Sequence, residues 1–142
     1  MKTSESGIEF IKGSRRLKLV AVLGSSDKLE IGFGHKQNTT PNQRILTRDA
    51  EVLLAYDLKV AEAILNESIT VDLSQNQFDA LISLIHDVGA DKFTQSTLVK
   101  VINKNPNDLA IKAQFQRLLD YSKSAESLTL RQNEAKLYFK KR

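Results

Sequence analysis

Hydrophobic residues recur along most of this chain at the three- or four-residue spacing of helices, and one early stretch alternates with a period of two. Near the N-terminus, Ser6-x-x-Glu9 has the spacing of a capping box, so we expect a short helix that begins at Ser6 and ends at Gly13. Residues 17–33 alternate on either side of a Gly-Ser-Ser-Asp turn, which predicts a β-hairpin. The first third of the chain is therefore expected to hold one helix and one small sheet.

The remaining two thirds carry helical patterns bounded by capping and breaking residues. Thr47 is expected to cap a helix that runs to about residue 66, which at roughly 28 Å is long enough to link two lobes. Ser74 has the spacing of a capping box with Gln77 and predicts a second helix, which ends at Gly89. Further helices are expected at about 96–104, 106–120 and 128–140. The pattern predicts an α+β protein that is mostly α.

Composition and charge are typical of one globular domain. The chain has 142 residues, of which 41% are hydrophobic and 27% charged, and these values argue against disorder. The net charge of +4 favours anionic partners, but the only dense basic run, residues 140–142, is interpreted as a solvated tail and not as a specific nucleic-acid site. No stretch is apolar enough for a signal peptide or a membrane span. We therefore expect a protein that is cytoplasmic as synthesised and is then released at lysis or carried in a virion.

Neither a metal site nor a cofactor site is predicted. The chain has no cysteine, and its two histidines, His35 and His86, lack the spacing of metal ligands on one helix. The sequence contains no phosphate-binding loop, no dinucleotide fingerprint and no nucleophile elbow. Chemistry that depends on such groups is therefore not expected.

Two separated motifs resemble those of a known family. Residues 31–35, I-G-F-G-H, resemble the T-I-G-Y-G-H signature of the phage-type lysozymes, the endolysins of glycoside hydrolase family 24. Residues 73–81, L-S-Q-N-Q-F-D-A-L, resemble the family segment L-T-Q-N-Q-F-D-A-L. The resemblance implies a phage-lysozyme fold over one domain, 1–142, with a β-hairpin lobe at about 13–46. A long interlobe helix and a helical C-terminal lobe would occupy about 47–142, together with the N-terminal helix.

The resemblance also indicates what became of the catalytic residues. In the family a general-acid Glu lies twenty positions before the His, an Asp eleven before it and a Thr five before it. Counted back from His35, these positions hold Arg15, Gly24 and Glu30. Arginine has no accessible neutral form and cannot protonate a leaving group, and glycine supplies no carboxylate. The resemblance therefore implies a catalytically degenerate member, a pseudo-lysozyme.

Three functions remain compatible with the sequence. We favour a non-catalytic binding, scaffold or virion-associated module whose partner is peptidoglycan or a protein, with an oligomer as one form of it. The enzymatic alternative is a muramidase that uses displaced acids, Glu30 and Asp27. The third is a module that binds peptidoglycan without cutting it. We expect Glu30 to pair with Arg15 or Arg16, and His35 to bond a nearby carboxylate. The candidate cleft residues are Val22, Phe33, His35, His86 and Ser96.

Overall fold

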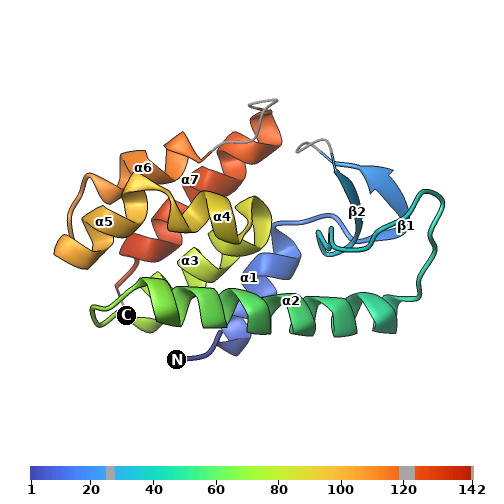
Figure 1. Cartoon of the computed structure of the whole chain (residues 1–142), viewed down its shortest axis with the longest axis horizontal. Helices are drawn as coiled ribbons and strands as arrows, with labels where there is room; N and C mark the ends of the chain where they lie inside the picture. The colour runs from blue at the N-terminus through green and yellow to red at the C-terminus, as the bar shows by residue number, and fades with distance from the viewer. Residues whose placement is uncertain (25–27, 119–123, 142) are drawn as a thin grey trace.

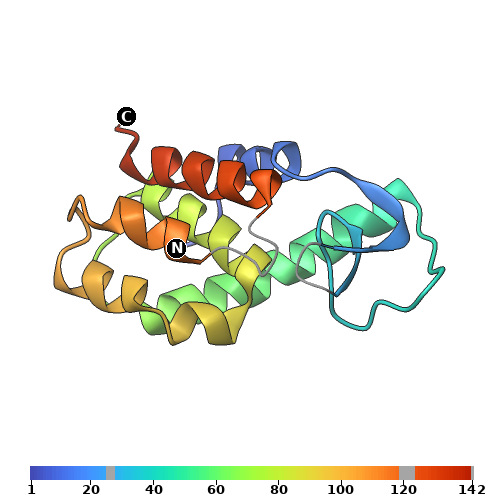
Figure 2. The same cartoon turned by 90° about the horizontal axis from the view of Figure 1, so that it is seen from above.

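A small β-lobe and a larger helical lobe are joined by one long helix (Figures 1 and 2). The structure is a computed structural model that describes residues 1–24, 28–118 and 124–141. In chain order the elements are α1 (Glu5–Gly13), β1 (Lys18–Leu23), β2 (Leu29–Gly32), α2 (Thr47–Ser68), α3 (Gln75–Val88), α4 (Ala90–Thr94), α5 (Thr97–Lys104), α6 (Ile111–Arg117) and α7 (Ala125–Phe139).

Helix α1 begins earlier than predicted. The Ser4 hydroxyl, not that of Ser6, accepts a hydrogen bond from the Gly7 N–H (3.0 Å), so the predicted cap at Ser6 is wrong. Ser4 is held in place because its own N–H donates to the Asp79 carboxylate on α3 (3.0 Å). The buried Asp79 therefore fixes both where α1 begins and how it lies against α3. The predicted end of the helix at Gly13 is confirmed.

The predicted β-hairpin is confirmed. β1 and β2 pair antiparallel, and Glu30 lies opposite Val22. On the other edge of β1, the Ala21 N–H donates to the Gln43 carbonyl (2.9 Å), so the chain between the hairpin and α2 returns along the sheet. This segment pairs with β1 only locally, at Val20 and Arg44, and the β-lobe is a two-stranded sheet with an extended segment beside it.

Helix α2 joins the two lobes. Its 22 residues span about 33 Å, and it packs against β2 at one end and against α3 and α4 at the other. Thr47 is its first residue and not its cap; the Asp49 carboxylate instead accepts the Leu46 N–H (2.9 Å). In the part of the chain that the structure describes, no helix has both the length and the apolar character needed to cross a membrane.

Helix α3 is the centre of the helical lobe. The predicted capping box is present, since the Ser74 hydroxyl accepts the Gln77 N–H (3.1 Å) and the Gln77 side chain accepts the Ser74 N–H (2.9 Å). Gly89 ends the helix with a φ of +89°, a conformation that favours glycine. α3 is buried by α1, α2, α4 and α7. The largest fully buried hydrophobic side chains of the protein are those of Tyr138, Phe78, Phe93, Phe115, Ile11, Ile31, Leu65, Leu81, Ile82, Leu84 and Leu98.

The last two helices begin at residues other than those predicted, and side-chain hydrogen bonds explain the difference. α6 begins at Ile111 and not at Pro106, because the Asn105 and Asp108 side chains each accept the N–H group two residues on and hold turns there. The predicted end of this helix near 120 lies outside the described residues. α7 begins earlier than predicted because Ser124 caps it. The short helix α4 was not predicted.

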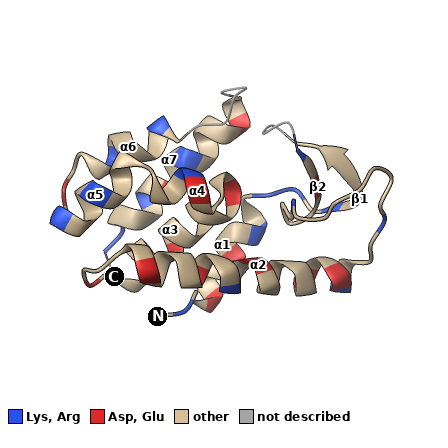
Figure 3. Cartoon of the chain, in the orientation of Figure 1, with Lys and Arg blue, Asp and Glu red and all other residues tan. Residues whose placement is uncertain are grey.

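Charged residues are distributed unevenly over the helices (Figure 3). Acidic residues predominate along α2, whereas the charged residues of α5 and α6 are all basic. The basic side chains exposed on α5 and α6 are those of Lys100, Lys104, Lys112 and Arg117. An anionic partner would therefore be attracted to the end of the helical lobe that lies away from the hairpin.

Candidate functional site

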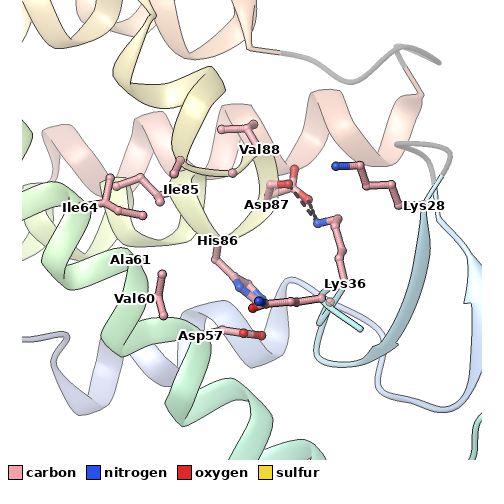
Figure 4. A pocket seen from close by; sticks show the side chains of 14 residues that line it. Lys28, Lys36, Asp57, Val60, Ala61, Ile64, Ile85, His86, Asp87 and Val88 are labelled. Carbon is pink, nitrogen blue, oxygen red and sulfur yellow. Dashed lines mark hydrogen bonds and ion pairs between the residues drawn. The ribbon is translucent and has the colours of Figure 1, made fainter. Parts of the chain in front are cut away.

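Two cavities lie where the β-lobe faces the helical lobe. One, of about 430 Å³, lies between Lys28 and Lys36 of the β-lobe and the facing sides of α2 and α3 (Figure 4). The other, of about 370 Å³, is lined by residues 14–16, by the hairpin and by the first turn of α7. Gly34 and Asp87 line both cavities. The interlobe cleft is therefore divided near these two residues.

Arg15 stands at the position that the family pattern gives to the acid, and its side chain points inward. One guanidinium nitrogen donates to the Ile11 carbonyl (3.2 Å) and the other to the Ser83 carbonyl on α3 (2.9 Å). Burial lowers the pKa of Arg15, while Asp87 and Glu134 act in the opposite direction. Because a guanidinium only donates hydrogen bonds, Arg15 binds these two carbonyl groups and ties the start of the β-lobe to α3.

Behind Arg15 lies a buried ionic network. The Ser83 hydroxyl donates to Glu134 (2.5 Å), and Arg131 donates to the other oxygen of Glu134 (2.5 Å). Arg131 also pairs with Asp87 and donates to the Leu118 carbonyl (3.0 Å). Arg131 and Glu134 have no exposed surface. Since each charge in this network has a charged or hydrogen-bonding partner, the network can persist in the protein interior.

The carboxyl groups of this network are shifted in opposite directions. Burial raises the pKa of Glu134, although Arg131 and Arg15 counteract it. Burial also acts to raise the pKa of Asp87, but the cations Arg131, Arg15 and Lys36 outweigh it and the net shift is downward. Asp87 at the cleft is therefore held as a carboxylate, whereas Glu134, whose pKa is raised, is buried in the core.

The space beside Gly24 is filled by the Glu30 side chain. A Cβ atom at Gly24 would lie 1.7 Å from a Glu30 carboxylate oxygen and 2.4 Å from its carboxyl carbon. The Glu30 side chain is only 13% exposed, and its ion pair is with Lys18 (3.8 Å). The prediction that Glu30 pairs with Arg15 or Arg16 is therefore wrong, because the hairpin directs Glu30 along the sheet. One carboxylate nevertheless remains near the place that the family pattern gives to Asp.

Two residues of the loop after β2 and two at the end of α3 tie the lobes together across the cleft; Figure 4 shows three of them, Lys36, His86 and Asp87. His86 Nε2 lies 2.7 Å from the Phe33 carbonyl oxygen, and Lys36 donates to the Asp87 carbonyl (3.0 Å). Burial and the neighbouring Arg15 lower the pKa of His86 to about 3. His86 is therefore neutral near pH 7, with the proton on Nε2, because the carbonyl can only accept. These contacts close the cleft where the two cavities meet.

The remaining predicted site residues are dispersed. His35 bonds the Asp57 carboxylate on α2 (2.8 Å), as expected, and burial raises the pKa of Asp57 while His35 opposes the shift. Phe33 is buried in the core, whereas Val22 lines the smaller cavity and is 39% exposed. Asp27 lies outside the described residues. Ser96 starts α5 and donates to the Phe93 carbonyl (2.6 Å); the residues that line the two cavities do not include it.

The chain resembles known proteins over most of its length. The sequence model of the phage lysozyme family matches residues 14–135. The chain belongs to the phage lysozyme family. The endolysin of Acyrthosiphon pisum secondary endosymbiont phage 1 is 38% identical over 103 residues, which cover 72% of this chain and 70% of that protein.

Two solved structures extend the similarity to the whole fold. The endolysin from Escherichia coli O157:H7 phage FAHEc1 is 28% identical with a TM-score of 0.81, over 98% of this chain and 94% of that one. The muramidase domain of SpmX from Asticaccaulis excentricus is 25% identical with a TM-score of 0.77, over 99% of each chain. The predicted phage-lysozyme fold, mostly helical with a small antiparallel sheet, is thereby confirmed.

In this member of the phage lysozyme family, several residues at the lobe junction were not assigned a site role from the sequence. Ser83, Glu134 and Lys36 belong to this group, and each is engaged by a residue far away in the chain. One signal was available, because Arg131 and Glu134 are three positions apart on a helical pattern, a spacing that brings opposite charges together. The contacts of Ser83 and Lys36 depend on how the lobes meet and have no local pattern.

Proposed function

We propose that this phage lysozyme family member is a non-catalytic module that binds cell-wall peptidoglycan without cleaving it. The observation that carries the proposal is the inward-pointing Arg15 guanidinium, held by the Ile11 and Ser83 carbonyls where the family pattern has a proton donor. Release at lysis or incorporation into a virion would bring such a module to the wall. In a variant of this proposal, the module is part of a scaffold and binds a protein partner in place of the wall.

The chemistry of glycoside hydrolysis supports a loss of activity. The reaction needs an acid to protonate the leaving oxygen and a carboxylate to stabilise or attack the cationic centre. A guanidinium at Arg15 cannot donate that proton and would repel the positive charge that develops on the sugar. Burial raises the pKa of Glu134, but Glu134 has no exposed surface, and the cations around Asp87 hold Asp87 ionised. Neither carboxyl group can replace the acid.

The contacts across the cleft support the same proposal. A glycan strand that entered between the lobes would have to break the bond from His86 to Phe33 and the bonds from Lys36 to Asp87. Breaking them without replacement leaves polar groups without partners in a partly buried place, which is costly. Wall polymers that carry negative charge can instead contact the exposed basic side chains of α5 and α6. Binding therefore does not require an open cleft.

The experiment is a lysis assay by turbidity and zymogram on purified cell walls, with a parallel sedimentation assay on insoluble peptidoglycan. The wild type is expected to sediment with peptidoglycan and to cause no lysis. A charge-reversed variant of the basic helices, Lys100→Glu with Lys112→Glu, is expected to lose retention, whereas reversal of two exposed lysines elsewhere, Lys2→Glu with Lys136→Glu, is the charge-matched control. Lysis by the wild type would overturn the proposal, and failure to sediment would leave the protein-scaffold variant.

Restoration of the family residues needs three changes. Gly24→Asp alone would collide with Glu30, so the variant combines Arg15→Glu, Gly24→Asp and Glu30→Thr. If the cleft still accommodates a glycan, this variant is expected to gain lytic activity. Its control, Arg15→Gln with the other two changes, has no acid at position 15 and is expected to stay inactive.

An active muramidase is the second candidate, and one observation favours it. The Glu30 carboxylate occupies the space beside residue 24, so one of the two carboxyl groups is retained in space although it comes from a different strand. In that case Glu30 would stabilise the cationic centre and Asp27 would be the partner acid. This hypothesis requires that the wild type lyses walls and that Glu30→Gln abolishes lysis while the melting temperature changes little.

A further inference from the structure

The outward side of α2 carries an apolar stripe. Val52, Tyr56 and Val60 follow one another at intervals of four residues, and 67%, 54% and 44% of their surfaces are exposed. Ala55 and Ala63 lie on the same exposed face. α2 runs along the lower side of the molecule in Figure 1, and Val60 lies at the edge of the stripe, where it also lines the larger interlobe cavity. The stripe is therefore a long, straight and accessible surface.

The two ends of this stripe carry charges in an unusual order. Arg48 lies in the first turn of α2 and Glu67 in the last turn, and both are exposed. The helix dipole favours the reverse arrangement, with anions at the start and cations at the end. Within the described part of the chain, neither residue has an ion pair. An opposite charge from outside the molecule would stabilise each of them.

We propose that a second copy of this chain packs antiparallel on α2 through this stripe. A twofold axis midway between positions 57 and 58 places Arg48 of each copy opposite Glu67 of the other. The same register brings the ammonium of Lys59 to the ring of Tyr56, a favourable pairing of a cation with an aromatic face. The apolar positions then face each other as Val52 with Ala63 and Ala55 with Val60. The face is thus complementary to itself in both charge and shape, as a twofold interface requires.

The charge of the helix favours this occupant over a membrane surface. Five of the seven charged residues of α2 are acidic, and an anionic lipid surface would repel them; a second copy carries the same acidic residues but also brings the two cations, Arg48 and Lys59, to the stripe. In the antiparallel pair, by contrast, the two helix dipoles are opposed and the end charges are matched. A contact through one helix of about 33 Å is small for an interface. The dimer is therefore expected to dissociate on dilution and to weaken as salt screens the end charges.

Sedimentation velocity on the full chain, from low micromolar to high micromolar concentration, tests the proposal. The wild type is expected to shift from monomer to dimer as the concentration rises. Arg48→Glu and Glu67→Arg each place like charges opposite one another twice in the symmetric dimer, so each should weaken association about tenfold. The double variant Arg48→Glu with Glu67→Arg restores both pairs and should recover the wild-type affinity. Lys112→Glu on α6 changes the net charge by the same amount as Arg48→Glu and should have no effect on association.

Recovery in the double variant is the decisive result, because misfolding or a general change in charge cannot produce it. Circular dichroism melts of all variants check that the fold is kept. A chain that stays monomeric at every concentration overturns the proposal. A dimer that the single charge reversals leave unchanged also overturns it, because another surface would then hold the copies together. Tyr56→Glu, at the centre of the stripe, is expected to abolish the dimer altogether.

Discussion

Replacing Gly24 with alanine tests whether the Glu30 carboxylate occupies the space beside residue 24. The new methyl group would lie 1.7 Å from a carboxylate oxygen, far inside van der Waals contact, so Glu30 must rotate away. Because the obstacle is the end of a flexible side chain, the cost is that of moderate overpacking and the loss of the Lys18 contact, about 1–2 kcal/mol. For a chain of this size, such a loss lowers the melting temperature by about 3–8 °C.

Gly13 provides the matched control for this prediction. A Cβ atom at Gly13 meets nothing within 4 Å, and the residue ends α1. Gly13→Ala is therefore expected to be neutral or to stabilise by up to about 1 kcal/mol, because alanine favours the helix. In thermal and urea melts, Glu30→Ala should relieve most of the cost of Gly24→Ala. If Gly24→Ala is as stable as the wild type, the side chain of Glu30 does not fill this space and the reasoning fails.

Two further predictions concern the charges at the lobe junction. The pKa of His86 is lowered from 6.5 to about 3 in the folded protein. Between these two pH values the unfolded chain binds a proton at His86 and the folded chain does not, so stability falls as the pH drops from about 6.5 toward 3. Between pH 7 and pH 4 the free energy of unfolding is expected to fall by roughly 3 kcal/mol. In urea melts the variant His86→Gln, whose side chain is a neutral donor, should lose most of this pH dependence. An equal pH dependence in the two proteins would contradict the shift. Arg131→Met leaves the buried Glu134 and Asp87 without their cation and should cost about 3–5 kcal/mol in urea melts, with partial recovery in the double variant Arg131→Met with Glu134→Met; a loss below about 1 kcal/mol would show that the network is not buried as described.

Local sequence patterns were sufficient to predict most of the fold. The hairpin and the capping box at Ser74 depend on residues within a few positions of one another, and both are present. The family motif at 31–35 and the segment that follows Ser74 give the lobes and their order. Ser4 and Ser6 show where such patterns fail. Either serine could cap α1, and the choice is made by Asp79, which lies 75 positions away from Ser4.

The site was less predictable because its side chains are directed by contacts between lobes. The sequence identifies the residues at the altered positions but not where they point. Arg15 turns inward because the Ile11 and Ser83 carbonyls accept its protons. Glu30 lies against Gly24 because the hairpin places these residues side by side, with a shift in register between Lys18 and Val22. Neither the partner of Glu30 nor the closure by His86 follows from spacing along the chain.

The altered positions are coupled to one another and to the core, so they cannot be reversed one at a time. A carboxylate at position 24 collides with Glu30, and removal of Glu30 in turn takes away the partner of Lys18. A glutamate at position 15 would lose the bonds that Arg15 donates to α3 and would approach two other carboxyl groups, those of Asp87 and Glu134. Each single reversal is therefore expected to lower stability, because Arg15 joins the start of the β-lobe to α3 and Glu30 fills the space beside Gly24.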